Sequence, residues 1–413
     1  MGCSVGVIGG GAAGLTAAIT AAGEGADVTL IERNDRLGRK ILSTGNGKCN
    51  LGNEKLDLEE YYTSEPDFLE SCLRRFGTDD TKAFFQRLGL MIKSRDGYLY
   101  PVSEQASAVL DVLRFEVTAL GIKVITDCNI EQIRKRSENK GIQVRGSGKT
   151  FFFDHVILAC GGRAAPKTGS DGGGYLLAKQ LGHTLIPTVP ALVQLRSGES
   201  YFKSVAGVRA DALLTVWHQD KAVVRERGEL QLTDYGISGI PVFQISRVVN
   251  YILMRNREIE IRINFLPDYD EENFADFCRR RMLLQEERTV EEFFSGMLHK
   301  KLMLLFIKMA GLKTTEKVAC VDRKKVSGVY ALCRDWRIPV TGSNPYENAQ
   351  VTAGGVPLTE VTENLESGKA PGVYFAGEIL DVDGKCGGYN LHWAWCSGYL
   401  AGKAAACKPP YKG

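Results

Sequence analysis

The sequence of 413 residues lacks several chemical signals, and each absence narrows its function. The eleven cysteines contain no C-x-x-C pair, which argues against a disulfide relay, and the five histidines show no metal-ligand spacing, so no metal site is predicted. No apolar run is long enough to span a bilayer, and the N-terminus lacks the basic region of an export signal. With an odd number of scattered cysteines, this predicts a cytoplasmic protein with reduced thiols.

The sequence also lacks a large excess of charge of either sign. The formal net charge is only +3, which gives no footprint for nucleic acid or for an anionic membrane. Basic runs at Arg279–Arg281 and Lys300–Lys301 are interpreted as solvated helix faces. The composition is that of a globular protein, and the length predicts two or three structural units, while the oligomeric state stays open.

The N-terminal residues carry the most informative pattern. In order, they predict a strand (Val5–Ile8), a G-x-G-x-x-G turn (Gly9–Gly14), a helix (Leu15–Ala22), a second strand (Val28–Ile31) and an acid (Glu32). Gly9 permits the tight turn, Gly11 lets a pyrophosphate approach the backbone, and Gly14 allows close packing of helix on strand. The acid can accept hydrogen bonds from ribose hydroxyls and would repel a 2′-phosphate. The stretch therefore predicts dinucleotide binding.

Three further loops have the composition of ligand loops. Leu37–Asn50 is basic and rich in glycine and amides, and the strand His155–Ala159 ends in two glycines. Near the C-terminus, the predicted strand Gly372–Glu378 leads through a glycine-rich loop into a helix over Leu391–Ala406. A second glycine turn that leads into a helix favours FAD over a nicotinamide alone. The start of this helix would direct its partial positive charge at the flavin pyrimidine.

The middle of the chain has a different pattern. From Ala191 short alternating segments predict a β unit, Ile259–Phe265 alternates strictly, and helical patterns follow an acidic run after Pro267. The predicted fold is α/β, with a Rossmann-type FAD domain over 1–190 and 346–413. The predicted inserted β domain covers 191–266 and 328–345, and a helical subdomain covers 267–327.

The chain resembles the bacterial NAD(P)/FAD-dependent oxidoreductase family that contains aminoacetone oxidase and the bile-acid 3-oxo-Δ4 reductase flavoproteins. The resemblance rests on motifs spread along nearly the whole chain, namely Gly9–Gly14, Gly38–Asn50, Ala159–Gly162, Gly169-Ser170, Gly228-Glu229, Thr233–Gly239, Thr352–Val356 and Phe375–Leu391. It implies a glutathione-reductase-like FAD domain with an inserted β-barrel-like domain and a small helical domain. Lys48 stands where the resemblance predicts Arg, a departure that bears on substrate selectivity.

The resemblance also implies which residues bind FAD. The pyrophosphate would lie on Gly9, Gly11, Ala12, Ala13 and Gly14, and the adenosine on Glu32, Arg33 and the backbone near Asn129 and Ile130. The phosphate and flavin would approach Arg39, Lys40, Asn46 and Gly47. Ala159, Gly161 and Gly162 would cover the middle of the cofactor, Gly377 and Glu378 the ribityl chain, and Gly388, Tyr389, Asn390 and Leu391 the pyrimidine edge.

The predicted activity is NAD(P)H-dependent reduction of an activated C=C bond in a small molecule, such as a 3-oxo-Δ4 steroid or another enone. This reaction needs a hydride from flavin N5 and a proton from an acid, for which Tyr389, His392 and Tyr235 are candidates. NADH or NADPH would dock transiently, because no second nicotinamide fingerprint occurs. Two alternatives stay open: an amine oxidase of the aminoacetone type that releases hydrogen peroxide, and a flavin-dependent RNA-modifying or RNA-binding protein.

Overall fold

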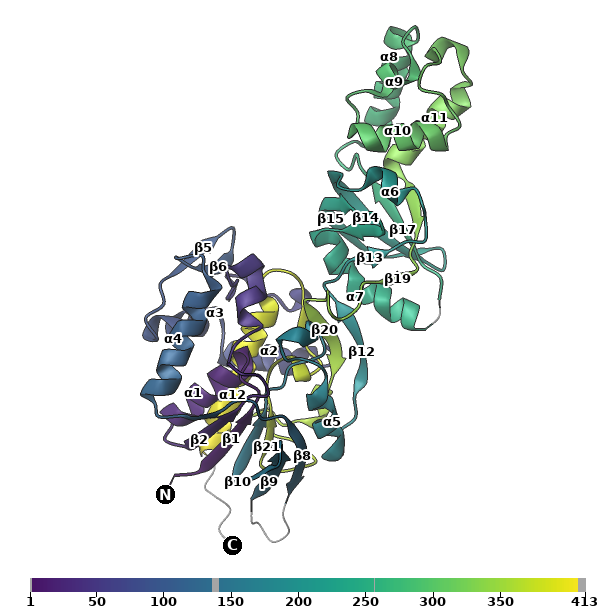
Figure 1. The fold of residues 1–413 in the computed structure, drawn as a ribbon. Helices are drawn as coiled ribbons and strands as arrows, with labels where there is room; N and C mark the ends of the chain where they lie inside the picture. The colour runs from purple at the N-terminus through teal and green to yellow at the C-terminus, as the bar shows by residue number, and fades with distance from the viewer. Residues whose placement is uncertain (1, 136–140, 256, 408–413) are drawn as a thin grey trace. The chain divides into compact units, whose positions relative to one another are not determined.

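The computed structural model describes residues 2–135, 141–255 and 257–407 (Figure 1). The chain divides into two compact units: unit 1 comprises Met1–Val189 with Ala349–Gly413, and unit 2 comprises Pro190–Asn348. The predicted α/β class with a Rossmann-type dinucleotide fold is confirmed. The finer predicted boundaries within the middle of the chain stay predictions. The predicted FAD domain includes residues 1, 136–140 and 408–413, and the predicted β domain includes residue 256; these residues lie outside the described ones.

Unit 1 is built on a parallel five-stranded sheet. Its strand order is β21 (Val373–Phe375), β11 (His155–Leu158), β1 (Ser4–Ile8), β2 (Asp27–Ile31) and β7 (Lys123–Ile125). The central strands β11 and β1 are almost wholly buried, as expected for a parallel sheet covered on both faces. The first and last segments of the chain therefore share one core.

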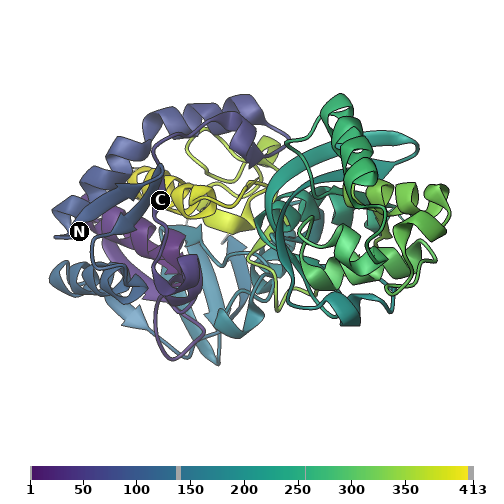
Figure 2. The same ribbon diagram turned by 90° about the horizontal axis from the view of Figure 1, so that it is seen from above.

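Two small-residue helices pack closely beside this sheet. They are α1 (Ala12–Gly23) and α12 (Tyr389–Cys407), which lie side by side in Figures 1 and 2. A Cβ added at Gly398 would come 2.5 Å from the carbonyl oxygen of Ala13, and one at Gly402 would come 2.5 Å from that of Ala17. Glycine is thus required for this close approach, which carries the C-terminal helix up to the start of α1.

Shorter elements surround the parallel sheet of unit 1. They are β3 (Gly52–Asn53), β4 (Tyr61–Tyr62), α2 (Pro66–Arg75), α3 (Thr78–Arg87), β5 (Ile92–Arg95), β6 (Tyr98–Pro101), α4 (Ala106–Ala119), β8 (Ile130–Lys135), β9 (Ile142–Gly146), β10 (Lys149–Phe153), α5 (Gly173–Gln180), β12 (Ile186–Ala191), β20 (Val351–Gly355) and β22 (Asp383–Gly384). The apolar segments 142–144 and 151–153 predict a hairpin or a small meander, and the structure has β9 and β10 as a hairpin with β8 as a third antiparallel strand. The helical spacing of aromatic and aliphatic residues predicts a helix over residues 61–75. This prediction is wrong at its start, because Tyr61 and Tyr62 pair with β22 and the helix begins at Pro66.

Unit 2 contains a seven-stranded antiparallel sheet and a group of helices. The strand order is β18 (Trp336–Pro339), β17 (Glu260–Asn264), β14 (Arg209–His218), β15 (Lys221–Leu232), β16 (Gly236–Ser238), β13 (Leu195–Arg196) and β19 (Gly342–Ser343). The helices are α6 (Phe202–Val205), α7 (Ile240–Met254), α8 (Glu271–Gln285), α9 (Val290–Phe294), α10 (Lys300–Met309) and α11 (Arg323–Arg334). The sequence patterns did not predict α7 and α11. Trp336, fully buried, is part of the core of this unit.

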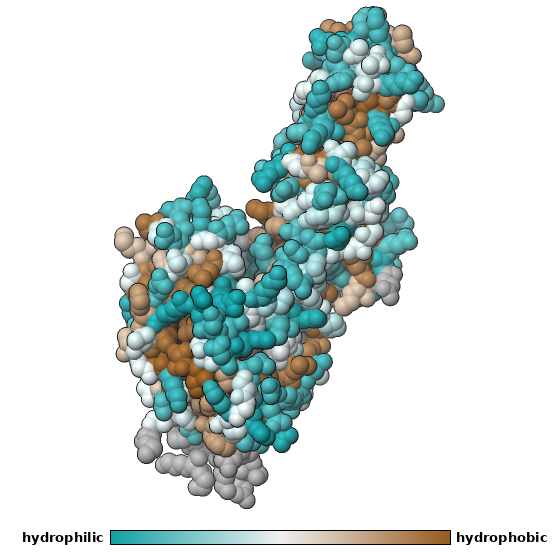
Figure 3. Space-filling model, in the orientation of Figure 1, coloured by the Kyte–Doolittle hydropathy of each residue, from teal (hydrophilic) through white to brown (hydrophobic). Residues whose placement is uncertain are grey.

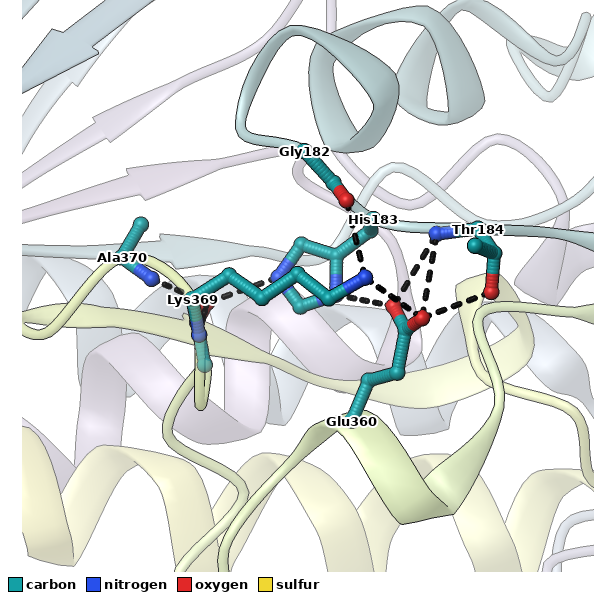
Figure 4. A network of polar contacts seen from close by, with 7 residues as sticks. Gly182, His183, Thr184, Glu360, Lys369 and Ala370 are labelled. Atoms are coloured by element: carbon teal, nitrogen blue, oxygen red, sulfur yellow. Dashed lines mark hydrogen bonds and ion pairs between the residues drawn. The ribbon is translucent and has the colours of Figure 1, made fainter.

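A polar network with a buried centre and an exposed edge joins the two chain segments of unit 1 (Figure 4). The His183 ring bonds Glu360 through Nδ1 (2.8 Å) and the Ser367 hydroxyl through Nε2 (2.7 Å). Glu360 also accepts hydrogen bonds from the Lys369 ammonium and the Thr184 hydroxyl, each at 2.6 Å. Burial lowers the pKa of His183, which the bond and charge of Glu360 partly offset. Ser367 is itself buried, so this serine–histidine–glutamate arrangement serves to hold the segments together.

In the view of Figure 3, hydrophilic residues cover much of each unit, and hydrophobic residues show in smaller areas. Among the described residues, no helix combines the length and the hydropathy needed to cross a membrane.

Candidate dinucleotide site

The glycine turn between β1 and α1 has the geometry that a bound pyrophosphate requires. Gly9 has φ 106°, a value that favours glycine, and a Cβ at Gly14 would overlap the carbonyl oxygen of Gly9. In contrast, no described atom lies within 4 Å of a Cβ built on Gly11. The first and third glycines are therefore needed by the turn itself, whereas the second faces open space.

The start of α1 can receive an anion. Gly11 is the N-cap, and within the described chain no side chain caps this end and no acid lies in the first turn. The first N–H groups of a helix have no partner inside it and carry its partial positive charge. The N–H groups of Ala12 and Ala13 are thus available for the phosphates of a dinucleotide, and the site fits FAD.

Glu32 lies at the end of β2 beside the glycine turn. Its Oε2 accepts a hydrogen bond from the Gly10 N–H (2.7 Å), and its Oε1 accepts from the N–H (2.8 Å) and the side-chain amide (2.7 Å) of Asn34. A carboxylate offers about four acceptor positions, so one on Oε2 is left for a ribose hydroxyl. A second ribose hydroxyl could bind Oε1 only in place of the side-chain amide of Asn34. Asn34 was not among the predicted site residues.

The predicted adenosine contacts gather near this acid. The Cys128 N–H donates to the Glu32 carbonyl (3.0 Å), and the predicted residues Asn129 and Ile130 follow Cys128 directly in the chain. Arg33 forms an ion pair with Asp171. The predicted phosphate residue Arg39 lies on the surface, where its guanidinium donates to the Asn34 side chain (3.3 Å).

Predicted residues from three distant segments meet in the middle of the site. The Lys40 ammonium pairs with the Glu378 carboxylate (2.8 Å), and a Cβ on Gly162 would lie 2.9 Å from the other carboxylate oxygen. Thr352 was not predicted, yet it connects this group. Its N–H donates to Glu378 (2.6 Å), and its hydroxyl accepts from the N–H groups of residues 163 (2.7 Å) and 164 (3.0 Å). The available signal was the motif 352–356, which contains two consecutive glycines.

Gly377 and Gly161, which each precede a member of the Gly162–Glu378 group in the chain, also have close neighbours. The Gly377 N–H donates to the Ser397 hydroxyl on α12 (2.8 Å), and its carbonyl accepts from the Trp393 indole (3.3 Å). A Cβ on Gly161 would lie 2.6 Å from the Ser170 hydroxyl. Ala159 is buried at the end of β11, beside Gly9.

The predicted flavin end is formed by the loops before β3 and α12. With its amide oriented as its neighbours require, Asn50 donates to the carbonyls of Leu99 and Gly52 and accepts from the Gly388 N–H. Asn390 exchanges two hydrogen bonds with the backbone of Gly384 (2.8 and 2.7 Å). The last helix begins at Tyr389, two residues before the predicted start at Leu391.

Two predicted flavin-loop residues, Asn46 and Gly47, lie on the surface. Both have positive φ angles, 54° and 84°, within a tight turn after Ile41. The structure brings neither of them into the group around Lys40 and Glu378.

The three candidate proton donors have different surroundings. Tyr389 is buried edge-on against Tyr61, with ring centroids 5.4 Å apart, and burial raises its pKa to about 12. Tyr235 belongs to unit 2, where its hydroxyl accepts from the Asn344 amide (3.2 Å) and the Arg196 guanidinium lies 5.3 Å from its ring centroid.

His392, the third candidate, lies in the core of unit 1. Its ring is fully buried between Thr81 (Nδ1 to Oγ1, 3.2 Å) and the Phe76 carbonyl (Nε2 to O, 3.3 Å). Burial lowers its pKa to about 4, opposed in part by the Phe76 bond and the charge of Asp80. At neutral pH the ring is therefore uncharged and packed against α2 and α3, which is a structural position.

A parallel βαβ unit, an open helix N-terminus, a ribose acid and a second glycine loop at a C-terminal helix define a Rossmann-type, FAD-dependent oxidoreductase. The profile of the HI0933-like protein Rossmann domain family matches residues 3–404, and the chain belongs to this family.

Known proteins agree with this class. The chain is 42% identical to the 3-dehydro-bile acid delta(4,6)-reductase of Clostridium scindens, over 98% of this chain and 99% of that protein. It is 29% identical to the ribosomal RNA dihydrouridine synthase of Haemophilus influenzae, over 95% and 96%. Its fold is similar to that of 3-ketosteroid delta1-dehydrogenase from Sterolibacterium denitrificans, with a TM-score of 0.51, 12% identity, and coverage of 97% of this chain and 99% of that one.

Proposed function

We propose that this flavoprotein uses NADH or NADPH to reduce a C=C bond conjugated to a carbonyl group, in a 3-oxo-Δ4 steroid or bile-acid-like substrate. The observation that carries the proposal is the 42% identity, over nearly the full length of both chains, to a bile-acid delta(4,6)-reductase. The glycine turn, Glu32 and the Lys40–Glu378 pair support it, because they form a site suited to FAD.

When bound, FAD supplies the two-electron chemistry of this reaction. The chain would hold the pyrophosphate at the start of α1 and the ribose at Glu32. The N-terminus of α12 would contribute about 0.3–1 kcal/mol to negative charge on the pyrimidine edge, and more where it is partly buried. Tyr389, with a pKa of about 12, keeps its proton throughout the physiological range and can donate it to the carbon beside the carbonyl.

Anaerobic rapid mixing tests the proposal. NADH or NADPH should bleach the flavin absorbance of the holoenzyme, and a 3-oxo-Δ4 steroid should then restore it with formation of the saturated ketone. Failure of both nucleotides to bleach the flavin, or of the enone to restore it, would refute the reductase. Oxygen consumption with aminoacetone would instead identify an amine oxidase.

A second candidate is reduction of uridine in ribosomal RNA. It is favoured by the 29% identity to a ribosomal RNA dihydrouridine synthase over 95% of the chain. The C5=C6 bond of uracil is also conjugated to a carbonyl, so the same hydride and proton would be required. Mass spectrometry of ribosomal RNA incubated with the holoenzyme and NADPH would detect a gain of two hydrogens per modified uridine, and unchanged RNA would exclude this candidate.

A further inference from the structure

A β-hairpin of unit 1 presents two cations and two tyrosines on a single face. Strands β5 and β6 are joined by Asp96 and Gly97, whose φ angles of 54° and 86° suit a two-residue turn that matches the strand twist. The register pairs Arg95 with Tyr98, and Lys93 with Tyr100. Because side chains alternate along a strand, these four share one face, and the buried Leu99 lies on the other.

This face forms one wall of a cavity of about 230 Å³. The cavity is lined by Lys48, Arg95, Asp96, Tyr98, Tyr100 and Glu104. Complete small-molecule pockets usually measure about 300–1,000 Å³. A cavity of this size is therefore suited to one end of a larger ligand.

The charged groups on and beside the cavity wall have an excess of one cation. Glu104 is bound by the ammonium groups of Lys48 (2.7 Å) and Lys93 (2.6 Å), whose hydrogen bonds lower its pKa to about 2. The ion pair of Arg95 with Asp96 is long, 3.8 Å, and both side chains are largely exposed. The lining holds two cations, Lys48 and Arg95, and two carboxylates, and Lys93 adds a third cation from behind Glu104. The Arg95 guanidinium keeps donors for a planar acceptor such as a carboxylate or a phosphate.

The cavity adjoins the loops predicted to hold the flavin ring. Lys48 follows Asn46 and Gly47 directly in the chain. In the loop before α12, a Cβ on Gly387 would lie 3.2 Å from Cε1 of Tyr98, and the Gly387 carbonyl accepts a hydrogen bond from the Asn53 amide (3.2 Å). A ligand whose reactive part reached these loops could thus place its other end between the tyrosines.

We propose that this hairpin cavity binds the anionic end of a ligand that reacts at the flavin, with Arg95 as the principal donor and the rings of Tyr98 and Tyr100 as its walls. The anion is either the side-chain carboxylate of an enone substrate or a phosphate of the nicotinamide donor. The inference rests on the proposed reductase function, and it assigns charge recognition to a site remote from the glycine turn.

Binding to the oxidised holoenzyme tests the inference without turnover. Calorimetric titration with 3-oxo-4-cholenoic acid, its methyl ester, NAD⁺ and NADP⁺ would compare the wild type with Arg95→Gln and Arg95→Lys. Arg74→Gln is a matched control, because Arg74 is an exposed arginine of α2 in an ion pair. Flavin content and absorbance spectrum would verify that each variant is correctly folded.

If the carboxylate is the ligand, Arg95→Gln should raise the Kd of the steroid acid about tenfold, and the Kd of the ester should change less than twofold. If a phosphate is the ligand, the Kd of NADP⁺ should rise about tenfold instead. Arg95→Lys should raise the Kd of the same ligand by a smaller factor than Arg95→Gln. Changes below twofold for both anions, or equal losses for acid and ester, would overturn the inference.

The two proposals can fail separately. Wild-type protein that binds the steroid acid more tightly than the ester, with this preference lost in Arg95→Gln, but that reduces no enone, would refute the reductase and retain the anion site. If the wild type reduces the enone but Arg95→Gln changes the Kd of none of the titrated ligands, the reductase is retained and the anion site is refuted.

Discussion

The buried ring of His392 should make the stability of unit 1 depend on pH between about 4 and 6.5. In the folded chain, burial among α2, α3 and α12 lowers its pKa to about 4, whereas an unfolded chain has the ordinary value near 6.5. Between these values the unfolded state binds more protons than the folded state. The free energy of unfolding therefore decreases as the pH falls through this window, and the contribution is complete above 6.5.

The magnitude follows from the pKa difference of about 2.5 units. At about 1.4 kcal/mol per unit, the holoenzyme should lose about 3 kcal/mol of stability from this group when the pH is lowered from 7 to 4. Removing the imidazole by His392→Asn should eliminate this component. It should also destabilise the protein at neutral pH, because the contacts with Thr81 and Phe76 are lost.

Urea unfolding of the holoenzyme at pH 7.5, 6 and 5, followed by the fluorescence of released FAD, measures this effect in unit 1. Carboxylates titrate in the wild type and in the variant alike, so the difference between the two midpoints isolates the histidine. That difference should shrink as the pH falls. A variant of the exposed His299, His299→Gln, should retain the wild-type pH dependence. A midpoint difference for His392→Asn that is constant across the three pH values would refute the reasoning.

Four further predictions concern the cofactor site and the proton donor. Gly14→Ala should yield protein with little flavin, because its Cβ overlaps a backbone carbonyl, whereas Gly23→Ala, with no described atom within 4 Å of the new Cβ, should retain a full absorbance spectrum. Glu32→Gln should raise the FAD Kd at least tenfold, since hydrogen bonds to a charged group contribute about 1.5–3 kcal/mol; an unchanged Kd would contradict its role. Thr352→Val should lower the urea midpoint, because each of two N–H groups loses its acceptor at about 1–3 kcal/mol, and Thr352→Ser should restore it. Tyr389→Phe should lower kcat about 100-fold or more with FAD still bound, and an unaffected kcat would exclude it as the proton donor.

Several elements could be predicted because their causes are local in the chain. The strand, glycine turn, helix and acid of residues 4–32 are consecutive, and each position has its own conformational requirement. The β9–β10 hairpin was predicted for the same reason. Helix α7 was missed although Gly239 and Pro241 mark its start, since its apolar residues follow directly on the strands of unit 2.

What the amino-acid sequence determined by itself was the presence of a dinucleotide fold and the positions of its glycines and its acid. Only the tertiary structure decided that Lys40 meets Glu378, 338 positions away, and that Thr352 joins them. It also decided that His392, one residue beyond the last predicted flavin contact, faces the core. The physical reason is that local patterns specify backbone conformation, whereas contacts between distant segments depend on how the sheet and helices pack. A single turn of α12 can therefore direct one side chain toward the ligand loops and another into the interior.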